Sequence, residues 1–129
     1  NTSKADIIKA TIDSLCFQTL DLVEAMQKDA KILIKEIRVD GGMINNDNFL
    51  QSLSNITQVN IIKPNNIETT SLGAAYLAAL NIGLVKNTIQ IEKLWKKNNL
   101  AKPKIDKKIL MPKIKKWRKA VNNLIKLNS

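Results

Sequence analysis

Residues 37–53 read IRVDGGMINNDNFLQSL, an apolar run that ends in an acid and two glycines before an amphipathic segment begins. The apolar run is rich in β-branched residues and predicts a strand, and the segment after the glycines predicts a short helix. Such a glycine pair is either a tight structural turn or a loop that lets the backbone approach a ligand. The run has neither the Walker A lysine nor the G-x-G-x-x-G spacing of a dinucleotide-binding loop, so spacing alone favours the structural turn.

The flanking segments predict an α/β chain with few strands. Residues 5–26 predict a long helix, because apolar side chains recur at alternating spacings of four and three. Its expected core face comprises Ile8, Ile12, Leu15, Thr19, Leu22 and Met26. Residues 58–64 predict a second strand, which Pro64 ends or places at a sheet edge. Two strands make a poor sheet on their own, so the chain is expected to form part of a larger one.

A helix rich in small residues is predicted at 72–80, after a polar start at 68–71. Gly73 and four alanines would let another backbone pack closely against it. Close packing is the expected compensation, because a glycine inside a helix costs about 1 kcal/mol relative to alanine.

The positive charge of the chain is concentrated in its last third. Residues 86–129 carry fourteen Lys or Arg against two Asp or Glu, whereas residues 1–85 carry seven against nine, and the sum is the net charge of +10. We therefore divide the chain into an α/β portion, 1–85, and a basic helical tail, 86–129. Helices are expected at 88–98 and 111–127, joined by a linker around 100–106. The second has an apolar face formed by Ile114, Trp117, Val121, Leu124 and Leu127, with Trp117 as an anchor.

The tail is almost all lysine, and the chain's only arginines are Arg38 and Arg118. Arginine is preferred for bidentate contacts to bases and phosphates, so a solvated lysine surface is favoured over a nucleic-acid interface. A small basic module that binds nucleic acid stays open as an alternative.

The single cysteine, Cys16, cannot form an internal disulfide. It lies in a helical pattern, and the sequence has no histidine to activate it, so a buried structural thiol in a reducing cytoplasm is expected. No apolar run approaches the roughly 20 residues that a membrane-spanning helix needs, and the first residues do not read as a secretory signal. We therefore expect no membrane association.

Four segments in order resemble the carboxyl-terminal part of the FGGY carbohydrate kinases, a family within the actin-like ATPase superfamily. They are ADIIKATIDSLCFQTLDLVEAM (5–26), RVDGGMINNDNFLQ (38–51), ETTSLGAAYLAAL (68–80) and KKWRKAV (115–121). The form VDGG followed by asparagine looks more like the glycerol kinases of the family than the xylulose and gluconate kinases, whose loops tend toward GGGA. The resemblance implies a partial actin-like ATPase (ribonuclease H-like) domain: the last part, residues 1–129, of the family's second, nucleotide-binding domain.

In this family the glycine loop lies against the bound nucleotide. The resemblance assigns nucleotide contact to Gly42 and Asn46, with Gly41 as the neighbouring turn residue. Asp40 would orient the loop or cap a turn, and Asn46 could also cap the following helix.

The resemblance implies ATP with Mg²⁺, and ADP as product, as ligands of the intact enzyme, with glycerol as the phosphoryl acceptor only there. The phosphate-binding loop, the Mg²⁺ ligands, the base and the glycerol-binding motifs belong to family segments that this sequence lacks, so no catalytic or metal-binding residue is expected. We expect the chain to be inactive alone, with the amino-terminal kinase portion as a partner and an oligomer as an open option. A structural remnant without function is the other alternative.

Overall fold

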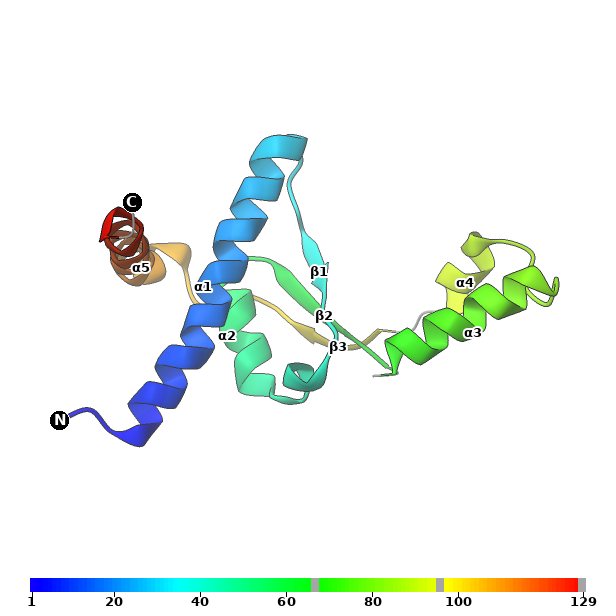
Figure 1. Ribbon diagram of the computed structural model, residues 1–129, viewed down its shortest axis with the longest axis horizontal. Helices are drawn as coiled ribbons and strands as arrows, with labels where there is room; N and C mark the ends of the chain where they lie inside the picture. The colour runs from blue at the N-terminus through cyan, green and yellow to red at the C-terminus, as the bar shows by residue number, and fades with distance from the viewer. Residues whose placement is uncertain (66–67, 95–96, 128–129) are drawn as a thin grey trace.

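The structure is a computed structural model that describes residues 1–65, 68–94 and 97–127. Its elements, in chain order, are α1 (Lys4–Ala30), β1 (Glu36–Arg38), the short 3-10 helix η1 (Gly42–Asn45), α2 (Asp47–Thr57), β2 (Asn60–Pro64), α3 (Thr69–Asn81), α4 (Thr88–Leu94), β3 (Lys97–Ala101) and α5 (Lys107–Leu127). Helix α2 packs between α1 and the sheet, α5 lies beside α1, and α3 with α4 extends away as an arm (Figure 1). The predicted α/β class with few strands is confirmed.

The described strands form one sheet in the order β1-β2-β3. Strands β1 and β2 are parallel, with Ile37 opposite Ile61, and β3 is antiparallel to β2. Pro64 is the last residue of β2. Because β2 is the central strand, the prediction that Pro64 ends the strand is confirmed and the edge-strand alternative is wrong.

Strand β3 corrects the sequence-based reading of the tail. The helix expected at 88–98 ends at Leu94, residues 95–96 lie outside the described part, and Lys97 begins a strand. Its polar sequence gives little strand signal, but pairing with β2 supplies partners for its backbone groups, which is tertiary context overriding propensity. Ser54 on α2 holds the end of β3 by donating a hydrogen bond to the carbonyl of Ala101 at 3.1 Å.

Helix α1 begins one residue before the predicted range, at Lys4, but buries a different face. The Ser3 hydroxyl accepts from the Asp6 N–H at 3.3 Å, and the Asp6 carboxylate accepts from the Ser3 N–H at 2.9 Å, which forms a capping box. These hydrogen bonds to Ser3 lower the pKa of Asp6. The buried residues of α1 are Cys16, Phe17, Leu20 and Val23.

The face predicted to be the core of α1 is mostly exposed: Leu22 is 59% and Met26 51% accessible to solvent. That prediction is wrong because α1 carries two apolar faces, and α2 and α5 cover only one of them.

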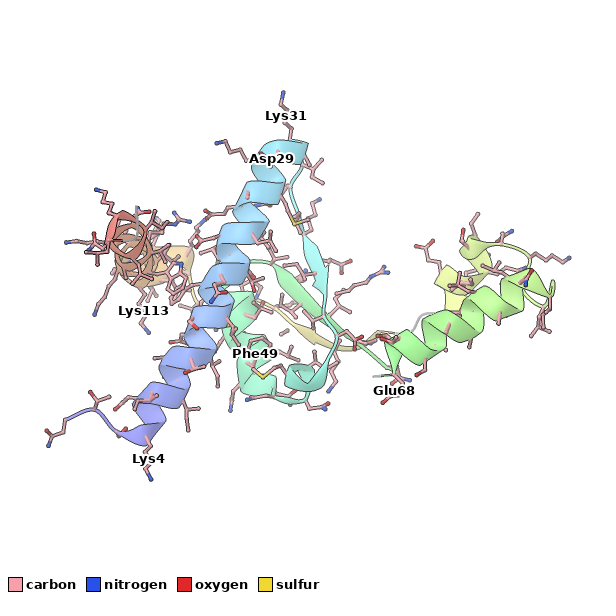
Figure 2. The ribbon with its side chains drawn as sticks, viewed as in Figure 1. Lys4, Asp29, Lys31, Phe49, Glu68 and Lys113 are labelled. Atoms are coloured by element: carbon pink, nitrogen blue, oxygen red, sulfur yellow. The ribbon has the colours of Figure 1, made fainter. Side chains whose placement is uncertain are left out.

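The hydrophobic core lies where α1, α2, α5 and the sheet meet. Leu50 and Leu53 of α2 are buried, and Phe49 is half-buried against the same cluster (Figure 2). The buried members of the cluster are Cys16, Phe17, Leu20, Ile44, Leu50, Leu53, Ile56, Ile61, Leu110 and Ile114. Two of them come from the basic tail, so the tail helps to form the core.

Helix α5 docks on α1 through the tryptophan anchor. Trp117 stacks on Phe17 with ring centroids 5.7 Å apart, and its Nε1–H donates to Asp21 at 2.7 Å. Arg118 adds ion pairs to Asp21 and Glu24. The predicted face is confirmed as far as Trp117, whereas the helix then runs past the core and leaves its last apolar residues exposed.

The arm formed by α3 and α4 begins near Glu68, where the chain leaves the sheet (Figure 2). The predicted helix at 72–80 is confirmed. Its expected close packing is not: no described residue of α3 is buried, and a Cβ added at Gly73 would meet no described atom within 4 Å.

Candidate functional site

The glycine loop lies at the carboxyl edge of the two parallel strands. Strand β1 leads into the loop and β2 leads toward α3, so both segments emerge at the same edge. The Val39 N–H donates to the carbonyl of Ile62 at 3.0 Å, which continues the pairing of the two strands up to the loop. Ligands of open α/β sheets bind at this edge.

Gly41 is required by the backbone of the turn. Its φ is +97° and its ψ is 175°, a conformation that residues with a side chain rarely adopt. Its carbonyl accepts from the Ile44 N–H at 3.2 Å, and the side chain of Ile44 is buried in the core. The structural interpretation of the glycine pair is therefore correct for Gly41.

Gly42 has no such internal explanation. Its φ lies outside the left-handed region, and a Cβ added there would meet no described atom within 4 Å. Neither strain nor packing within the described chain demands a glycine. An exposed glycine with open space before it leaves room for another molecule to contact the backbone.

Asp40 links this loop to the start of the arm. One carboxylate oxygen accepts from the Gly41 N–H at 2.7 Å, and the other accepts from the hydroxyl of Thr69, the first residue of α3. The first bond agrees with the interpretation of Asp40 as a turn cap, and the second joins the loop to α3. Sequence reasoning did not single out Thr69, since its contact joins residues 29 positions apart.

The asparagines after the glycines have separate local roles. The side-chain oxygen of Asn46 accepts from the Phe49 N–H at 3.1 Å, which confirms the predicted cap of α2. This cap uses only the oxygen, so the amide NH₂ is the group that Asn46 can offer to a ligand. Asn45 accepts from Nζ of Lys63 at 3.1 Å, which brings a positive charge beside the loop.

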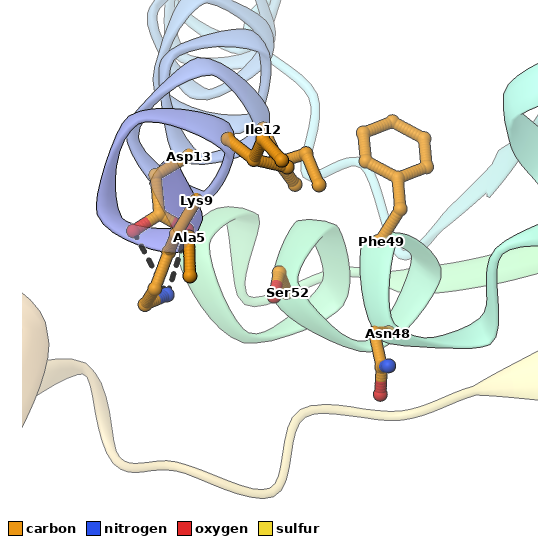
Figure 3. Close-up of a pocket in the computed structure, with 8 residues that line it drawn as sticks. Ala5, Lys9, Ile12, Asp13, Asn48, Phe49 and Ser52 are labelled. Carbon is orange, nitrogen blue, oxygen red and sulfur yellow. Dashed lines mark hydrogen bonds and ion pairs between the residues drawn. The ribbon is translucent and has the colours of Figure 1, made fainter. Parts of the chain in front are cut away.

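Two grooves lie away from the loop. One, of about 320 Å³, separates α1 from α2 and is shown in Figure 3; a second, of about 430 Å³, separates α1 from α5. The first is lined by Ala5, Ile8, Lys9, Ile12, Asp13, Asn48, Phe49 and Ser52. Neither of these two grooves includes residues 41–46.

Two other kinds of site find little support in the part of the chain that the structure describes. No group of three or more His, Cys, Asp or Glu side chains is placed there to hold a metal ion. Cys16 is fully buried, as predicted, and burial raises the pKa of its thiol to about 12, so it is an inert core residue. Across the described ranges, no helix is both long enough and apolar enough to cross a membrane.

Comparison with known proteins agrees with this geometry. Residues 1–82 match the C-terminal domain of the FGGY family of carbohydrate kinases. A glycerol kinase of Mycoplasmoides gallisepticum is 43% identical over 120 residues, and that of Deinococcus radiodurans is 40% identical over 120 residues. Both alignments cover 93% of this chain and 24% of the relative, so the chain spans about a quarter of the length of the curated relatives it matches.

Solved structures give the same answer for the fold. The Plasmodium falciparum glycerol kinase crystallised with ADP aligns with a TM-score of 0.83 and 31% identity, over 95% of this chain and 25% of that one. A ligand-bound xylulose kinase from Lactobacillus acidophilus aligns with a TM-score of 0.74 at 22% identity, which bears on the fold alone. The predicted partial actin-like ATPase fold and the resemblance to the carboxyl-terminal part of glycerol kinases are confirmed. Since the family match covers more than half of the chain, the protein belongs to the FGGY family of carbohydrate kinases.

Proposed function

We propose that this chain forms one wall of the ATP/ADP site of a glycerol kinase. In this proposal Gly42 and Asn46 contact the nucleotide, and Gly41 shapes the turn that presents them. The observation that carries the proposal is Gly42 itself, an exposed glycine that the chain's own backbone and packing do not require. A bound nucleotide supplies the missing reason for a glycine at this position.

Two neighbouring features support an anionic ligand at this edge of the sheet. The N-terminus of α3 is tied to the loop through Thr69 and Asp40, and a helix N-terminus favours phosphate through its N–H groups and dipole. Lys63 adds a positive charge that is held beside the loop by Asn45. The likeness to a kinase solved with ADP supports the same ligand.

The reaction assigned to the intact enzyme is transfer of the γ-phosphoryl group of ATP to glycerol, which gives glycerol 3-phosphate and ADP. Mg²⁺ would neutralise the developing charge on the phosphates. The described residues offer no carboxylate cluster for that ion, so they do not fit a metal site and we assign this chain no step through the metal. The role of this chain is to position the nucleotide. We expect no ATP- and glycerol-dependent turnover from the chain alone.

The nucleic-acid alternative loses support in the folded chain. Part of the tail's positive charge is paired with acids of α1, as in the contacts from Lys107 to Glu24 at 3.6 Å and from Arg118 to Asp21 at 3.5 Å. Strand β3 and helix α5 are also used to build the core.

The single thiol, Cys16, is buried and free, which agrees with the reducing, cytoplasmic location that belongs to this proposal.

Calorimetric titration of the whole chain with Mg-ADP tests the nucleotide assignment. We expect saturable binding that Gly42→Val weakens at least tenfold, a loss of about 1.4 kcal/mol, because the added side chain occupies the space of the ligand. Gly73→Val is the matched control: Gly73 also has open space before it and no positive φ, but it lies on the arm. Equal affinity of the Gly42→Val chain, with its circular dichroism unchanged, would contradict the proposal. Failure of the folded wild-type chain to bind would favour the structural remnant.

A further inference from the structure

Lys63 brings a cation to the glycine loop from the neighbouring strand. Side chains alternate between the two faces of a strand, so Lys63 lies on the same face of β2 as Ile61, whose side chain is buried in the core. Lys63 is half-buried, and its Nζ donates to the side-chain oxygen of Asn45 in η1 at 3.1 Å. A half-covered stem and a hydrogen-bonded end hold the ammonium group beside the loop.

The sheet loses its regular pairing immediately after Lys63. Lys63 lies opposite Asn99 of β3 and Pro64 lies opposite Lys97, so β3 carries one extra residue between the two pairs. Proline has no N–H to donate to the ladder, which accounts for a break at this point. Bulges of this kind end strand pairing and re-aim side chains, and they are over-represented next to active sites. The break therefore marks the end of β2 as a place where a side chain is directed to a site.

The partner of Lys63 holds the charge without neutralising it. Asn45 is a neutral amide, and its oxygen accepts from one of the three N–H donors of an ammonium group. Within the described part of the chain, no carboxylate forms an ion pair with Lys63. The carboxylate of the loop, Asp40, is bonded instead to the Gly41 N–H and the Thr69 hydroxyl. A cation that is fixed but not neutralised is suited to an anionic ligand.

This charge bears on one part of the proposed ligand. ADP carries its negative charge on the phosphates, whereas its adenosine portion is neutral. Charge-assisted hydrogen bonds from an ammonium group to a phosphate are stronger than bonds between neutral groups. The same ammonium group adds little to the binding of an uncharged base and ribose. Lys63 is therefore placed to act on the choice between a nucleotide and a nucleoside.

We propose that Lys63 is a specificity-determining residue, which makes the site prefer a nucleoside diphosphate to the uncharged nucleoside. Its ammonium group, held by Asn45, pairs with a phosphate oxygen of the nucleotide bound at Gly42 and Asn46. This inference rests on the proposed function, because it requires the nucleotide to bind at the glycine loop. It assigns the discrimination to a residue of β2, outside that loop.

Calorimetric titrations of the whole chain with Mg-ADP and with adenosine test the proposal. We expect the wild-type chain to bind Mg-ADP about tenfold more tightly than adenosine. Lys63→Met keeps an unbranched apolar stem and removes the charge, so the affinity for Mg-ADP should fall about fivefold or more, while that for adenosine changes less than about twofold. Lys63→Arg keeps the charge and should retain most of the preference.

Asn45→Asp is the second variant, and it leaves Lys63 in place. A carboxylate of the same shape still accepts the hydrogen bond but neutralises the ammonium group, so the affinity for Mg-ADP should fall as it does for Lys63→Met. Lys35→Met is the matched control, because Lys35 is exposed, precedes β1 at the edge of the sheet opposite the loop, and carries the same charge. It should change neither affinity by more than about twofold.

Several results would overturn the proposal. Equal losses of Mg-ADP and adenosine affinity in Lys63→Met, with circular dichroism unchanged, would make Lys63 a structural support of the loop. Unchanged Mg-ADP affinity in Asn45→Asp and in Lys63→Met would remove the phosphate contact and leave the nucleotide assignment of Gly42 standing. A wild-type chain that binds both ligands equally would do the same. If the folded wild-type chain binds neither ligand, the proposed function fails and this inference fails with it.

Discussion

Replacing Ile114 by alanine tests whether the basic tail belongs to the folded core. Ile114 is 1% exposed and packs in the cluster formed by α1, α2 and the sheet. The substitution removes about three methylene-sized groups, each worth about 0.8 kcal/mol when buried, and leaves a cavity whose cost adds to that sum. We expect the free energy of unfolding to fall by about 3 kcal/mol.

The control is Ile109→Ala in the same helix, where the side chain is 70% exposed. Both substitutions change helix propensity equally, so their difference isolates burial. The control should alter stability by no more than about 0.5 kcal/mol.

Urea and thermal unfolding, followed by circular dichroism at 222 nm, measure the difference. For a domain of this size 3 kcal/mol corresponds to a fall of about 10 °C in Tm, with an unchanged denaturant slope. Equal effects of Ile114→Ala and Ile109→Ala would refute the account, because α5 would then be a tail that the core does not need.

Three further predictions address single contacts. Trp117→Phe keeps the ring stack but removes the N–H donor to Asp21, so the free energy of unfolding should fall by about 1 kcal/mol. A change near zero would mean that this hydrogen bond contributes nothing to stability. Gly41→Ala should lower the free energy of unfolding by about 1–3 kcal/mol because the φ of Gly41 is +97°, whereas Gly42→Ala should change it by less than about 0.5 kcal/mol. Equal losses for the two variants in urea unfolding would contradict the roles assigned to the two glycines. Burial raises the pKa of the Cys16 thiol to about 12 in the folded chain, so this thiol ionises at a lower pH in the unfolded chain. The free energy of unfolding should therefore fall as the pH rises from about 9 toward 12. Cys16→Ala should reduce this alkaline loss in urea titrations, and an identical loss would exclude the thiol as its cause.

Local signals predicted most of the elements but not how they are covered. Helix α2 was predictable because its apolar spacing coincides with its buried face, and the apolar spacing of α5 coincides with its packed face only as far as Trp117. The buried face of α1 was not predictable, because two apolar faces give the same local pattern and only the tertiary partner decides between them. Strand β3 was missed because it is held by backbone pairing to β2 and not by an apolar alternation.

The candidate site was predictable in part for a similar reason. The positions of the two glycines and of the Asn46 cap follow from the local sequence. The different requirements at Gly41 and Gly42 become visible only from backbone angles and surrounding space. The bond from Thr69 to Asp40 depends on how the two parallel strands place their carboxyl ends, which no local pattern contains.

The most direct test of the nucleotide assignment is a titration of the ¹⁵N-labelled chain with Mg-ADP, followed by amide chemical shifts. We predict saturable shifts confined to residues 41–46 and the first turn of α3, which Asp40 joins through Thr69. Shifts centred instead on the lysines beside the groove between α1 and α5, Lys113 and Lys116, would place the anion on the basic tail and contradict the assignment. The absence of shifts in residues 41–46 of a folded chain would contradict it equally.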